Sequence, residues 1–591
     1  MTRSSTALTD YLDAFADADE PFLTYFSFAP DKSIQTATFT RGEFWSLARQ
    51  AASVLHDASL GCGDCFAHLF SGNRVEDLAF RLAATMTGAV PVTVNWQADT
   101  PERIAYKIEL TESRLVVTDT GTPAETLDAL KRQFPELQFF GVDQLATRPE
   151  LPEDAFCTDA ALDRDATRII IFTSGTTGRP KGVRLTYRSY VTNRATFESF
   201  LQIGPDDRFA PLIVNPLHHT NSTAITDWAL RRPRTRLHLV ERYATQYWAI
   251  VADVGGRGFD RVVAPSVSRH FDYLENLRVE DRLPVDLETL KDAMHHVDFL
   301  IGSAPVGPTT INRLVEYTGR IPLVRFGSTE TCLQVMGTPL TLSEDERLAA
   351  FRKGWAHVRD GEAHGGYYIG RPHPPYTECR VVRGVARDDD GYLVDCDEGE
   401  PGYLITRGEN LMSGYVKNPE ATREVMHEDG WYSGLRDVCF RLTSEVDGED
   451  DFYWMSRDSA MLIRGGVNYS YDQINAELKS FITGKYGLAE DAFDVAVVGL
   501  HLTSEHDDDC CVTVELKTPE ARALKSEIEQ TFLKDAADGV SKGSKPDFLR
   551  FAEIPRNFKG AILVPELKKT YEKRGQTPFL DRQSNKRLEG P

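Results

Sequence analysis

A short polar loop after position 172 has the composition of an anion-binding site. Apolar residues at 169–172 predict a buried strand, and the next six positions carry only hydroxyl side chains and glycine. Glycine lets backbone N–H groups approach phosphate oxygens closely, hydroxyls donate further hydrogen bonds, and Lys181 adds a positive charge. The stretch lacks the Gly-Lys-Ser/Thr of the common P-loop, so we interpret it as a nucleotide-phosphate loop of another kind. The competing interpretation is a flexible surface loop.

Two more predicted strands end in similar turns, at 302–305 and 327–331. Ligand sites in α/β folds gather at the carboxyl ends of strands, so we expect these turns and the loop at 173–181 to line one crevice. A further polar stretch, 218–223, carries two adjacent histidines between a strand and a helix. It is either part of a ligand site or a helix-capping turn, and the sequence leaves both open.

The predicted elements place these turns in an α/β fold. Roughly the first 150 residues alternate strand and helix patterns, including a helix over 39–58 with Thr40 as its N-cap. From about residue 370 strands and turns dominate, which predicts a β-rich subdomain, and a compact α+β piece of about 130 residues follows. We therefore predict a large N-terminal domain of layered α/β subdomains plus a β-rich subdomain, and a small α+β C-terminal domain.

Composition narrows the class of function. The 591 residues are enough for two or more domains, and 67 basic against 89 acidic residues give a net charge of −22. This acidity argues against partners that are nucleic acids or anionic membranes. The polar N-terminus and the lack of a long apolar run predict a cytoplasmic protein. Nine scattered cysteines fit a reducing compartment, and Cys62 and Cys65 are expected to be plain thiols, without a metal or redox role.

Six stretches occur in order along the chain. They are TSGTTGRPKG at 173–182, NPLHHTNS at 215–222, GSAPV at 302–306, FGSTET at 326–331, a region from GYLITRG at 402 to DGWYSGLRDV ending at 438, and SRDSAMLIRGGVN at 456–468. Together they resemble the adenylate-forming superfamily, which includes acyl-CoA synthetases, luciferase-like enzymes and the adenylation domains of peptide synthetases. The resemblance runs from about Phe39 to Leu567.

The resemblance implies an ATP site. The β- and γ-phosphates would be held by Thr173, Ser174, Gly175, Thr176, Thr177, Gly178 and Lys181. The adenine and the α-phosphate would lie against Gly302, Ser303, Ala304, Pro305, Phe326, Gly327, Ser328 and Thr329. Glu330 would hold Mg²⁺, Asp437 would accept both ribose hydroxyls, and Arg457 would contact ribose or phosphate.

The resemblance also implies where the acid and the thiol bind. His219, Asn221 and Thr223 would line the acyl pocket, with His219 beside the carboxylate, and Gly465 and Gly466 would lie near the tunnel for coenzyme A. The catalytic residues would be Lys559, Thr329, Glu330 and His219. The domains would be 1–456, which binds AMP, and 457–591, which is mobile about a hinge near 457–462. Polar residues at 221–223 and at Asp227 favour a short or polar acid over a long-chain fatty acid.

The chain departs from the family pattern in three places. Two residues are inserted before Asp437, which leaves Asp447 and Asp429 as alternative ribose ligands. The usual hinge position holds Ala460 and not an aspartate or lysine, with Asp458 two residues earlier. The usual catalytic lysine falls on Ala561. Lys559 lies two positions earlier on the same side of an extended segment, displaced by roughly 6.5–7 Å, so it either reaches the same anions or is a surface lysine.

The implied activity is that of an ATP-dependent acid–thiol ligase, an acyl-CoA synthetase that forms acyl-AMP and transfers the acyl group to coenzyme A. Its cofactors would be ATP, Mg²⁺ and coenzyme A, and its substrate a small carboxylic acid. Three alternatives remain: an enzyme that only converts acyl-AMP to thioester, an adenylating partner of a separate carrier protein, and a catalytically silent relative. The sequence leaves open whether the protein is a monomer or a homodimer.

Overall fold

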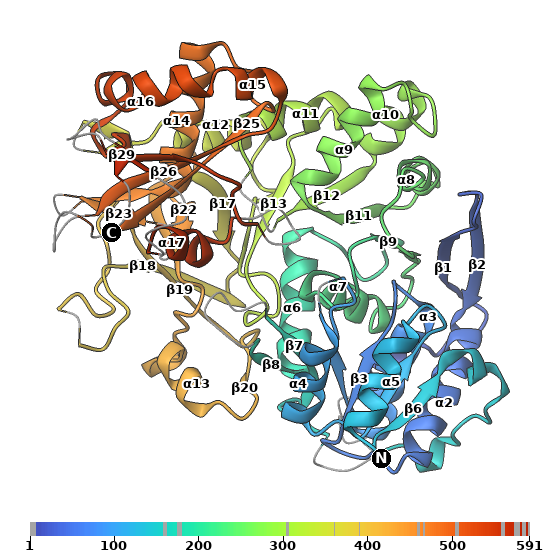
Figure 1. Ribbon diagram of the computed structural model, residues 1–591. Helices are drawn as coiled ribbons and strands as arrows, with labels where there is room; N and C mark the ends of the chain where they lie inside the picture. Colours follow the sequence, from blue (N-terminus) through green and yellow to red (C-terminus); the bar gives the residue numbers. More distant parts are fainter. Residues whose placement is uncertain are drawn as a thin grey trace.

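The computed structural model of the chain describes residues 8–97, 99–157, 162–173, 180–302, 306–359, 361–363, 365–388, 390–457, 461–464, 467–500, 502, 508–556, 562–572, 579–581 and 587–588. Their elements form two large sheets and one smaller sheet with helices between and around them (Figure 1). The N-terminal elements lie at the lower right of Figure 1, and the last elements of the chain gather at the upper left.

A seven-stranded sheet carries the start of the phosphate loop. Its order is β20-β8-β7-β4-β3-β5-β6, with bounds Gly414–Tyr415, Gly182–Thr186, Thr167–Phe172, Val90–Thr93, Cys65–Leu69, Leu115–Thr118 and Gln138–Gly141. The strands from β7 to β6 run parallel, whereas β8 and β20 add antiparallel pairs at one edge. The loop therefore leaves the carboxyl end of a buried parallel strand, as the sequence predicts.

A thirteen-stranded sheet carries the other turns. Its order is β18-β19-β21-β22-β17-β14-β13-β12-β11-β9-β10-β1-β2, with bounds Thr377–Val382, Gly402–Gly408, Asp437–Thr443, Asp450–Arg457, Tyr367–Pro372, Met336–Gly337, Leu323–Phe326, Val297–Ile301, Arg261–Ser266, Phe209–Ile213, Leu237–Val240, Pro21–Phe28 and Ile34–Thr40. The middle strands from β13 to β1 are parallel. The β-rich region after residue 370 continues this sheet through β14 and β17, so it is an antiparallel extension of the α/β sheet.

Two layers of helices cover this sheet. Helices between the two large sheets share one hydrophobic cluster: α2 (Arg41–Asp57), α3 (Val75–Thr87), α6 (Tyr187–Phe200) and α7 (Thr220–Leu230). The opposite face is covered by α8 (Tyr247–Gly255), α9 (Ser268–Val279), α10 (Leu287–His295), α11 (Pro308–Thr318) and α12 (Glu344–Trp355). The predicted cap of α2 is confirmed, because the Thr40 side chain accepts a hydrogen bond from the Glu43 backbone and Glu43 reciprocates.

The C-terminal region has a core of its own. Its five-stranded sheet has the order β25-β26-β27-β28-β29, with bounds Phe493–Leu500, Asp509–Leu516, Phe548–Phe551, Phe579–Asp581 and Arg587–Leu588. A hairpin of β23 (Met461–Arg464) and β24 (Val467–Ser470) precedes it, and its helices are α14 (Tyr471–Tyr486), α15 (Pro519–Ala523), α16 (Lys525–Gly539) and α17 (Val564–Glu572). The buried members of its hydrophobic cluster all lie between Leu462 and Tyr571.

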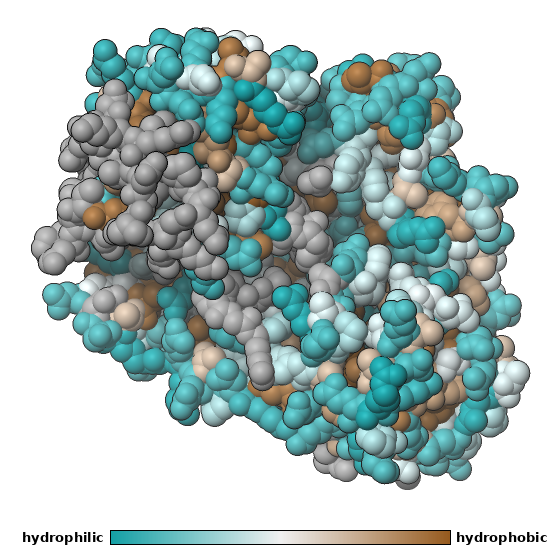
Figure 2. Space-filling model, in the orientation of Figure 1, coloured by the Kyte–Doolittle hydropathy of each residue, from teal (hydrophilic) through white to brown (hydrophobic). Residues whose placement is uncertain are grey.

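The remaining helices are peripheral, namely α1 (Thr9–Ala14), α4 (Pro101–Thr111), α5 (Ala124–Gln133) and α13 (Pro419–Val425). The face of the molecule in Figure 2 is mainly hydrophilic where its residues are coloured, with apolar residues in small groups. In the described parts of the chain, every helix is too short or too polar to cross a membrane.

Candidate active site

The base of the phosphate loop is a hairpin between β7 and β8. Phe172 pairs with Gly182 across the hairpin, and the Thr173 N–H donates a hydrogen bond to the Lys181 carbonyl at 3.1 Å. The two strands therefore hold the two described ends of the loop together. The loop residues Ser174, Gly175, Thr176, Thr177 and Gly178 lie outside the described residues.

Tyr415 joins this loop to the turn that carries Glu330. The Lys181 ammonium lies 4.9 Å from the centre of the Tyr415 ring, and the Tyr415 hydroxyl donates to Glu330 Oε1 at 3.1 Å. Burial, followed by the charge of Glu330, raises the pKa of Tyr415, so its phenol stays protonated and remains a donor. The Lys181 ammonium and the Glu330 carboxylate, which come from separate turns, thus both contact the Tyr415 side chain.

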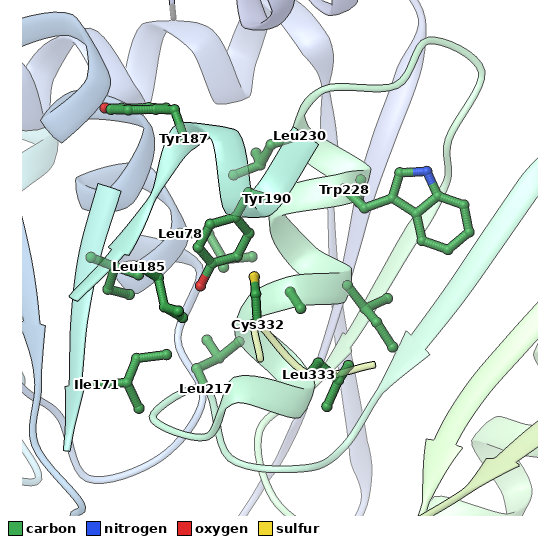
Figure 3. Packing of buried hydrophobic residues seen from close by; sticks show 14 of the residues in the cluster. Leu78, Ile171, Leu185, Tyr187, Tyr190, Leu217, Trp228, Leu230, Cys332 and Leu333 are labelled. Carbon is green, nitrogen blue, oxygen red and sulfur yellow. The ribbon is translucent and has the colours of Figure 1, made fainter. Parts of the chain in front are cut away.

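The turn at 327–333 is held in shape by backbone constraints. A Cβ on Gly327, where φ is +157°, would lie 1.7 Å from the Leu333 carbonyl oxygen, so only glycine fits. The Ser328 N–H donates to Thr331 Oγ1 at 2.8 Å, and Asn410 Nδ2 donates to the Thr331 carbonyl at 2.8 Å. Figure 3 shows Cys332 close to the Tyr190 ring, with Leu217 and Leu333 beside them. This packing presents Thr329 and Glu330 away from the core.

Asp437 begins β21 and is almost fully buried. Its Oδ1 accepts a hydrogen bond from Trp454 Nε1 on β22 at 2.8 Å, and its backbone pairs with that of Arg457. The charges of Glu330 and Asp437 both act on the buried Tyr432, whose pKa is raised well above its usual value mainly by burial. Asp437 and Glu330 therefore both lie near Tyr432.

The alternative ribose ligands lie in other surroundings. Asp447 forms an ion pair with Arg371 at 2.7 Å, which lowers the pKa of the carboxyl. Asp429 lies in a 3-10 turn with φ of +56°. Because Asp447 already has a cationic partner, Asp437 is the better placed acceptor.

The adenine turn is described only at its first residue. The Gly302 N–H approaches the Ser266 carbonyl at 3.4 Å, and a Cβ on Gly302 would lie 3.0 Å from Cζ of Arg325. Ser303, Ala304 and Pro305 are not among the described residues. Gly302 follows β12 and Phe326 ends the adjacent strand β13, so this turn and the Glu330 turn are neighbours.

The histidine stretch forms the start of α7. His219 occupies the N-cap position, its side chain makes no capping hydrogen bond, and its ring lies 4.3 Å from that of His218. Thr223 accepts a hydrogen bond from the Tyr190 hydroxyl at 3.2 Å and is buried between α6 and α7. Asn221 is buried as well, and its Oδ1 has no hydrogen-bond partner among the described residues. Asn221 is thus better placed for a ligand than Thr223.

Asp227 belongs to a buried ion network. Its carboxylate accepts hydrogen bonds from the Tyr11 hydroxyl at 2.8 Å and Arg168 Nε at 3.1 Å, and a third from Arg231 Nε at 2.7 Å. These partners hold the pKa of Asp227 below its usual value in spite of burial. Asp227 therefore fixes α7 to β7 and α1, and its carboxylate is occupied by these partners.

The expected residues of the C-terminal region fall mostly outside the described part. Gly465, Gly466, Asp458, Ala460, Lys559 and Ala561 all lie there. Arg457 is described as the last residue of β22. The position of the catalytic lysine therefore remains the sequence-based prediction.

Tyr415 and Asn410 make contacts in the site, although the sequence motifs assign neither residue a role. Both lie in the region 402–438 that carries the family resemblance. The signal available in the sequence was their place within that region, between the strand ending at Gly408 and the ribose aspartate.

The donor set at Glu330 fits a magnesium ion. Mg²⁺ binds one or two carboxylates and takes its remaining ligands from water and substrate phosphates. Glu330 offers one carboxylate, and the described residues hold no cluster of three or more metal-ligating side chains, as a closed protein-only site would require. Cys62 lies 2.8 Å from Cys157, sulfur to sulfur, in a hydrogen bond, and the two are not joined by a disulfide.

A family model described as "AMP-binding enzyme" matches residues 16–416. The chain therefore belongs to the AMP-binding enzymes of the adenylate-forming superfamily, at family level the AMP-forming acid–CoA ligases. This confirms the resemblance drawn from the sequence. ATP, Mg²⁺ and coenzyme A are the cofactors of this family.

Curated relatives are CoA ligases for different acids. The chain is 27% identical over 546 residues to the long-chain-fatty-acid–CoA ligase FadD13 of Mycobacterium tuberculosis, covering 90% of this chain and 93% of that protein. It is 27% identical over 448 residues to the sulfoacetate–CoA ligase of Cupriavidus necator, covering 74% and 76%. At these identities the acid differs between relatives, so they do not fix the substrate.

Solved structures confirm the α/β fold over nearly the whole chain. ATP-bound MatB from Rhodopseudomonas palustris superposes with a TM-score of 0.70 at 21% identity, covering 96% of this chain and 99% of that one. The o-succinylbenzoate CoA synthetase MenE from Bacillus subtilis, in complex with its acyl-adenylate, gives 0.70 at 20% identity with the same coverage.

Proposed function

We propose that the protein is an AMP-forming acid–CoA ligase that activates a small carboxylic acid. The observation that carries this proposal is the link from Lys181 through Tyr415 to Glu330, with the buried Asp437 near Tyr432. A cation for phosphates, a carboxylate suited to Mg²⁺ and a buried acceptor for ribose form the chemistry of a nucleotide site.

The first half-reaction is the attack of a carboxylate oxygen on the α-phosphorus of ATP. A new P–O bond forms, the bond to the β-phosphate breaks, and pyrophosphate leaves with the electron pair. Lys181 and the loop bind the leaving phosphates, Thr329 contacts the α-phosphate, and His219 orients the acid. Glu330 would hold Mg²⁺, which would supply neutralisation of the charge on the phosphate oxygens. Fixed donors lower the barrier because they need no reorganisation as charge develops.

The second half-reaction is attack of the coenzyme A sulfur on the acyl carbonyl of acyl-AMP. A C–S bond forms, the bond to AMP breaks, and AMP leaves. We propose domains 1–456 and 457–591 with a pivot near 457–462, Gly465 and Gly466 at the tunnel for coenzyme A, and Arg457 at the ribose or phosphate. The separate core of the C-terminal region supports a domain able to rotate as a unit.

Lys559 is proposed as the lysine that serves adenylation. The Lys559→Ala variant should lose pyrophosphate release yet still convert supplied acyl-AMP and coenzyme A to thioester. If both half-reactions persist unchanged, Lys559 does not have this role.

The decisive experiment measures pyrophosphate release over a panel of carboxylic acids, with and without coenzyme A. Release without the thiol supports adenylation, and AMP with acyl-CoA as products supports the full ligase. Release that yields thioester only with a carrier protein would indicate an adenylating partner. If no acid releases pyrophosphate but acyl-AMP is consumed, the protein is a thioester-forming enzyme. If neither occurs, it is a silent relative.

A further inference from the structure

Arg325 is a buried arginine at the carboxyl edge of the large sheet. It lies on β13, one residue before Phe326, and only 4% of its surface is exposed. Its guanidinium lies over Gly302, since a Cβ there would be 3.0 Å from Cζ and 3.1 Å from Nη1. Its backbone partner on β14 is Gly337, which also lacks a side chain. The guanidinium thus packs against the backbone of Gly302, where a side chain would collide with it.

Among the described residues this guanidinium has no counter-charge. Neither Nε nor Nη2 has a hydrogen-bond partner there, and Arg325 takes part in none of the ion pairs found in that part of the chain. Other buried arginines differ, because Arg41, Arg168, Arg231 and Arg371 pair with carboxylates and Arg550 bonds to threonine hydroxyls. Burial alone lowers the pKa of Arg325 to about 10, so it is still charged at neutral pH.

An unpaired buried charge strongly destabilises a folded protein. Native structures satisfy nearly all buried polar groups, and exceptions call for an explanation such as an absent ligand. The guanidinium offers a planar fork of donors that matches a carboxylate or a sulfonate. Arg325 therefore has the properties of a receptor for an anion brought by a ligand.

Unsatisfied polar side chains also occur among the residues packed around Gly337, the cross-strand partner of Arg325, and around α6. Leu323, on the same face of β13 as Arg325, belongs to the hydrophobic cluster shared by α6 and α7. A Cβ on Gly337 would meet the Phe200 ring of α6 at 2.7 Å and Gln334 Nε2 at 3.2 Å. Gln334 Oε1 is buried without a partner among the described residues. The side-chain amide of Asn193 is also buried without a partner among the described residues. Asn193 lies seven residues before Phe200, on the same face of α6.

We propose that Arg325 binds a second anionic group on the acid substrate, and that the protein activates short acids whose tail ends in a carboxylate or a sulfonate. This inference rests on the proposed ligase function. The reacting carboxylate lies at the nucleotide site, one turn beyond Phe326, and the tail runs beneath α6 and α7 to the guanidinium. An acid with a neutral tail leaves Arg325 unpaired in a site closed to water, so selectivity comes from the cost of that unpaired charge.

The test compares acids of equal carbon number, namely malonate with propionate, succinate with butyrate and glutarate with valerate, with sulfoacetate as the sulfonate probe. Pyrophosphate release should favour the doubly charged member of at least one pair by about 30-fold or more in kcat/KM, because unpairing a buried charge costs at least this much. The Arg325→Gln variant should lose that preference through KM for the acid, with KM for ATP unchanged. Arg325→Lys should retain part of it.

Arg261→Gln is the matched control. Arg261 lies at the opposite, amino end of β11 in the same sheet, where it pairs with Asp298 at 2.9 Å, and its removal should leave the preference between acids intact. Arg325→Gln should not lower the melting temperature of the unliganded protein, since it removes an unpaired charge. A clear fall in melting temperature would indicate a structural role and overturn the proposal.

The outcomes separate this inference from the ligase function. Pyrophosphate release that favours the singly charged acids, or a preference that survives in Arg325→Gln, overturns the role of Arg325 and leaves the ligase intact. If no acid is activated, isothermal titration calorimetry with the same acids tests whether Arg325 binds the second anionic group. Binding of a doubly charged acid to the wild type, lost in Arg325→Gln, supports the site, and equal or absent binding in both proteins refutes it.

Discussion

The contact between Tyr415 and Glu330 allows a sharp test of the nucleotide site. Tyr415→Phe removes one hydroxyl and keeps the ring beneath Lys181, so it deletes the 3.1 Å hydrogen bond to Glu330. A hydrogen bond to a charged group contributes about 1.5–3 kcal/mol, which corresponds to roughly 10- to 150-fold in kcat/KM. Glu330 is partly exposed, and water can replace the lost donor, so we expect the lower end, about 10-fold.

The assay is pyrophosphate release with an active acid, followed by conversion of supplied acyl-AMP with coenzyme A. The first reaction should slow and its Mg²⁺ requirement should rise, whereas the second should change by less than about twofold, because Glu330 serves adenylation. The matched control is Tyr453→Phe, which deletes a 3.2 Å hydrogen bond to the Ala350 carbonyl away from the site. If Tyr415→Phe releases pyrophosphate at the wild-type rate, or slows both half-reactions equally, the contact does not position Glu330.

Four other variants test neighbouring parts of the argument. Asp437→Asn should raise KM for ATP by about 10-fold or more through loss of a charged acceptor, and an unchanged KM would exclude ribose binding there. Trp454→Phe removes the 2.8 Å donor to Asp437 and should produce a smaller rise in the same KM, measured alongside. Asp227→Asn should cost about 3–5 kcal/mol in denaturant unfolding by leaving two arginines without their carboxylate, while KM for the acid is unchanged. A normal stability with a raised KM would instead return Asp227 to the acyl pocket. Gly327→Ala should abolish pyrophosphate release with normal circular dichroism, since the added Cβ would displace Leu333, and full activity would contradict the described turn.

Local features of this protein could be predicted from sequence because they depend on nearby residues. The cap of α2 at Thr40 and the strand before Thr173 follow from residue types a few positions apart. The same holds for the turn after Phe326, whose glycine is required by its own backbone. These elements decide where chain reversals occur and which strands end in polar turns.

Contacts between residues far apart in the sequence cannot be predicted from local residue patterns. Tyr415 and Glu330 are 85 residues apart, and the partners of Asp227 include Tyr11, 216 residues away. Asp227 appeared to belong with the polar residues of the acyl pocket, because nothing local indicates that Arg168 and Arg231 neutralise it. The isolation of Arg325 is likewise visible only once every neighbour is placed.

The continuity of the large sheet has a consequence for biosynthesis. Its strands extend along the chain from Pro21 to Arg457, and the parallel strands in the middle pair with segments made much later. At about 5–20 residues per second, a ribosome needs roughly 20–90 s to pass residue 457. Until then β17 lacks its neighbour β22, and that strand edge stays open. Nascent chains that stall in this interval would therefore be the form of the protein most dependent on chaperones.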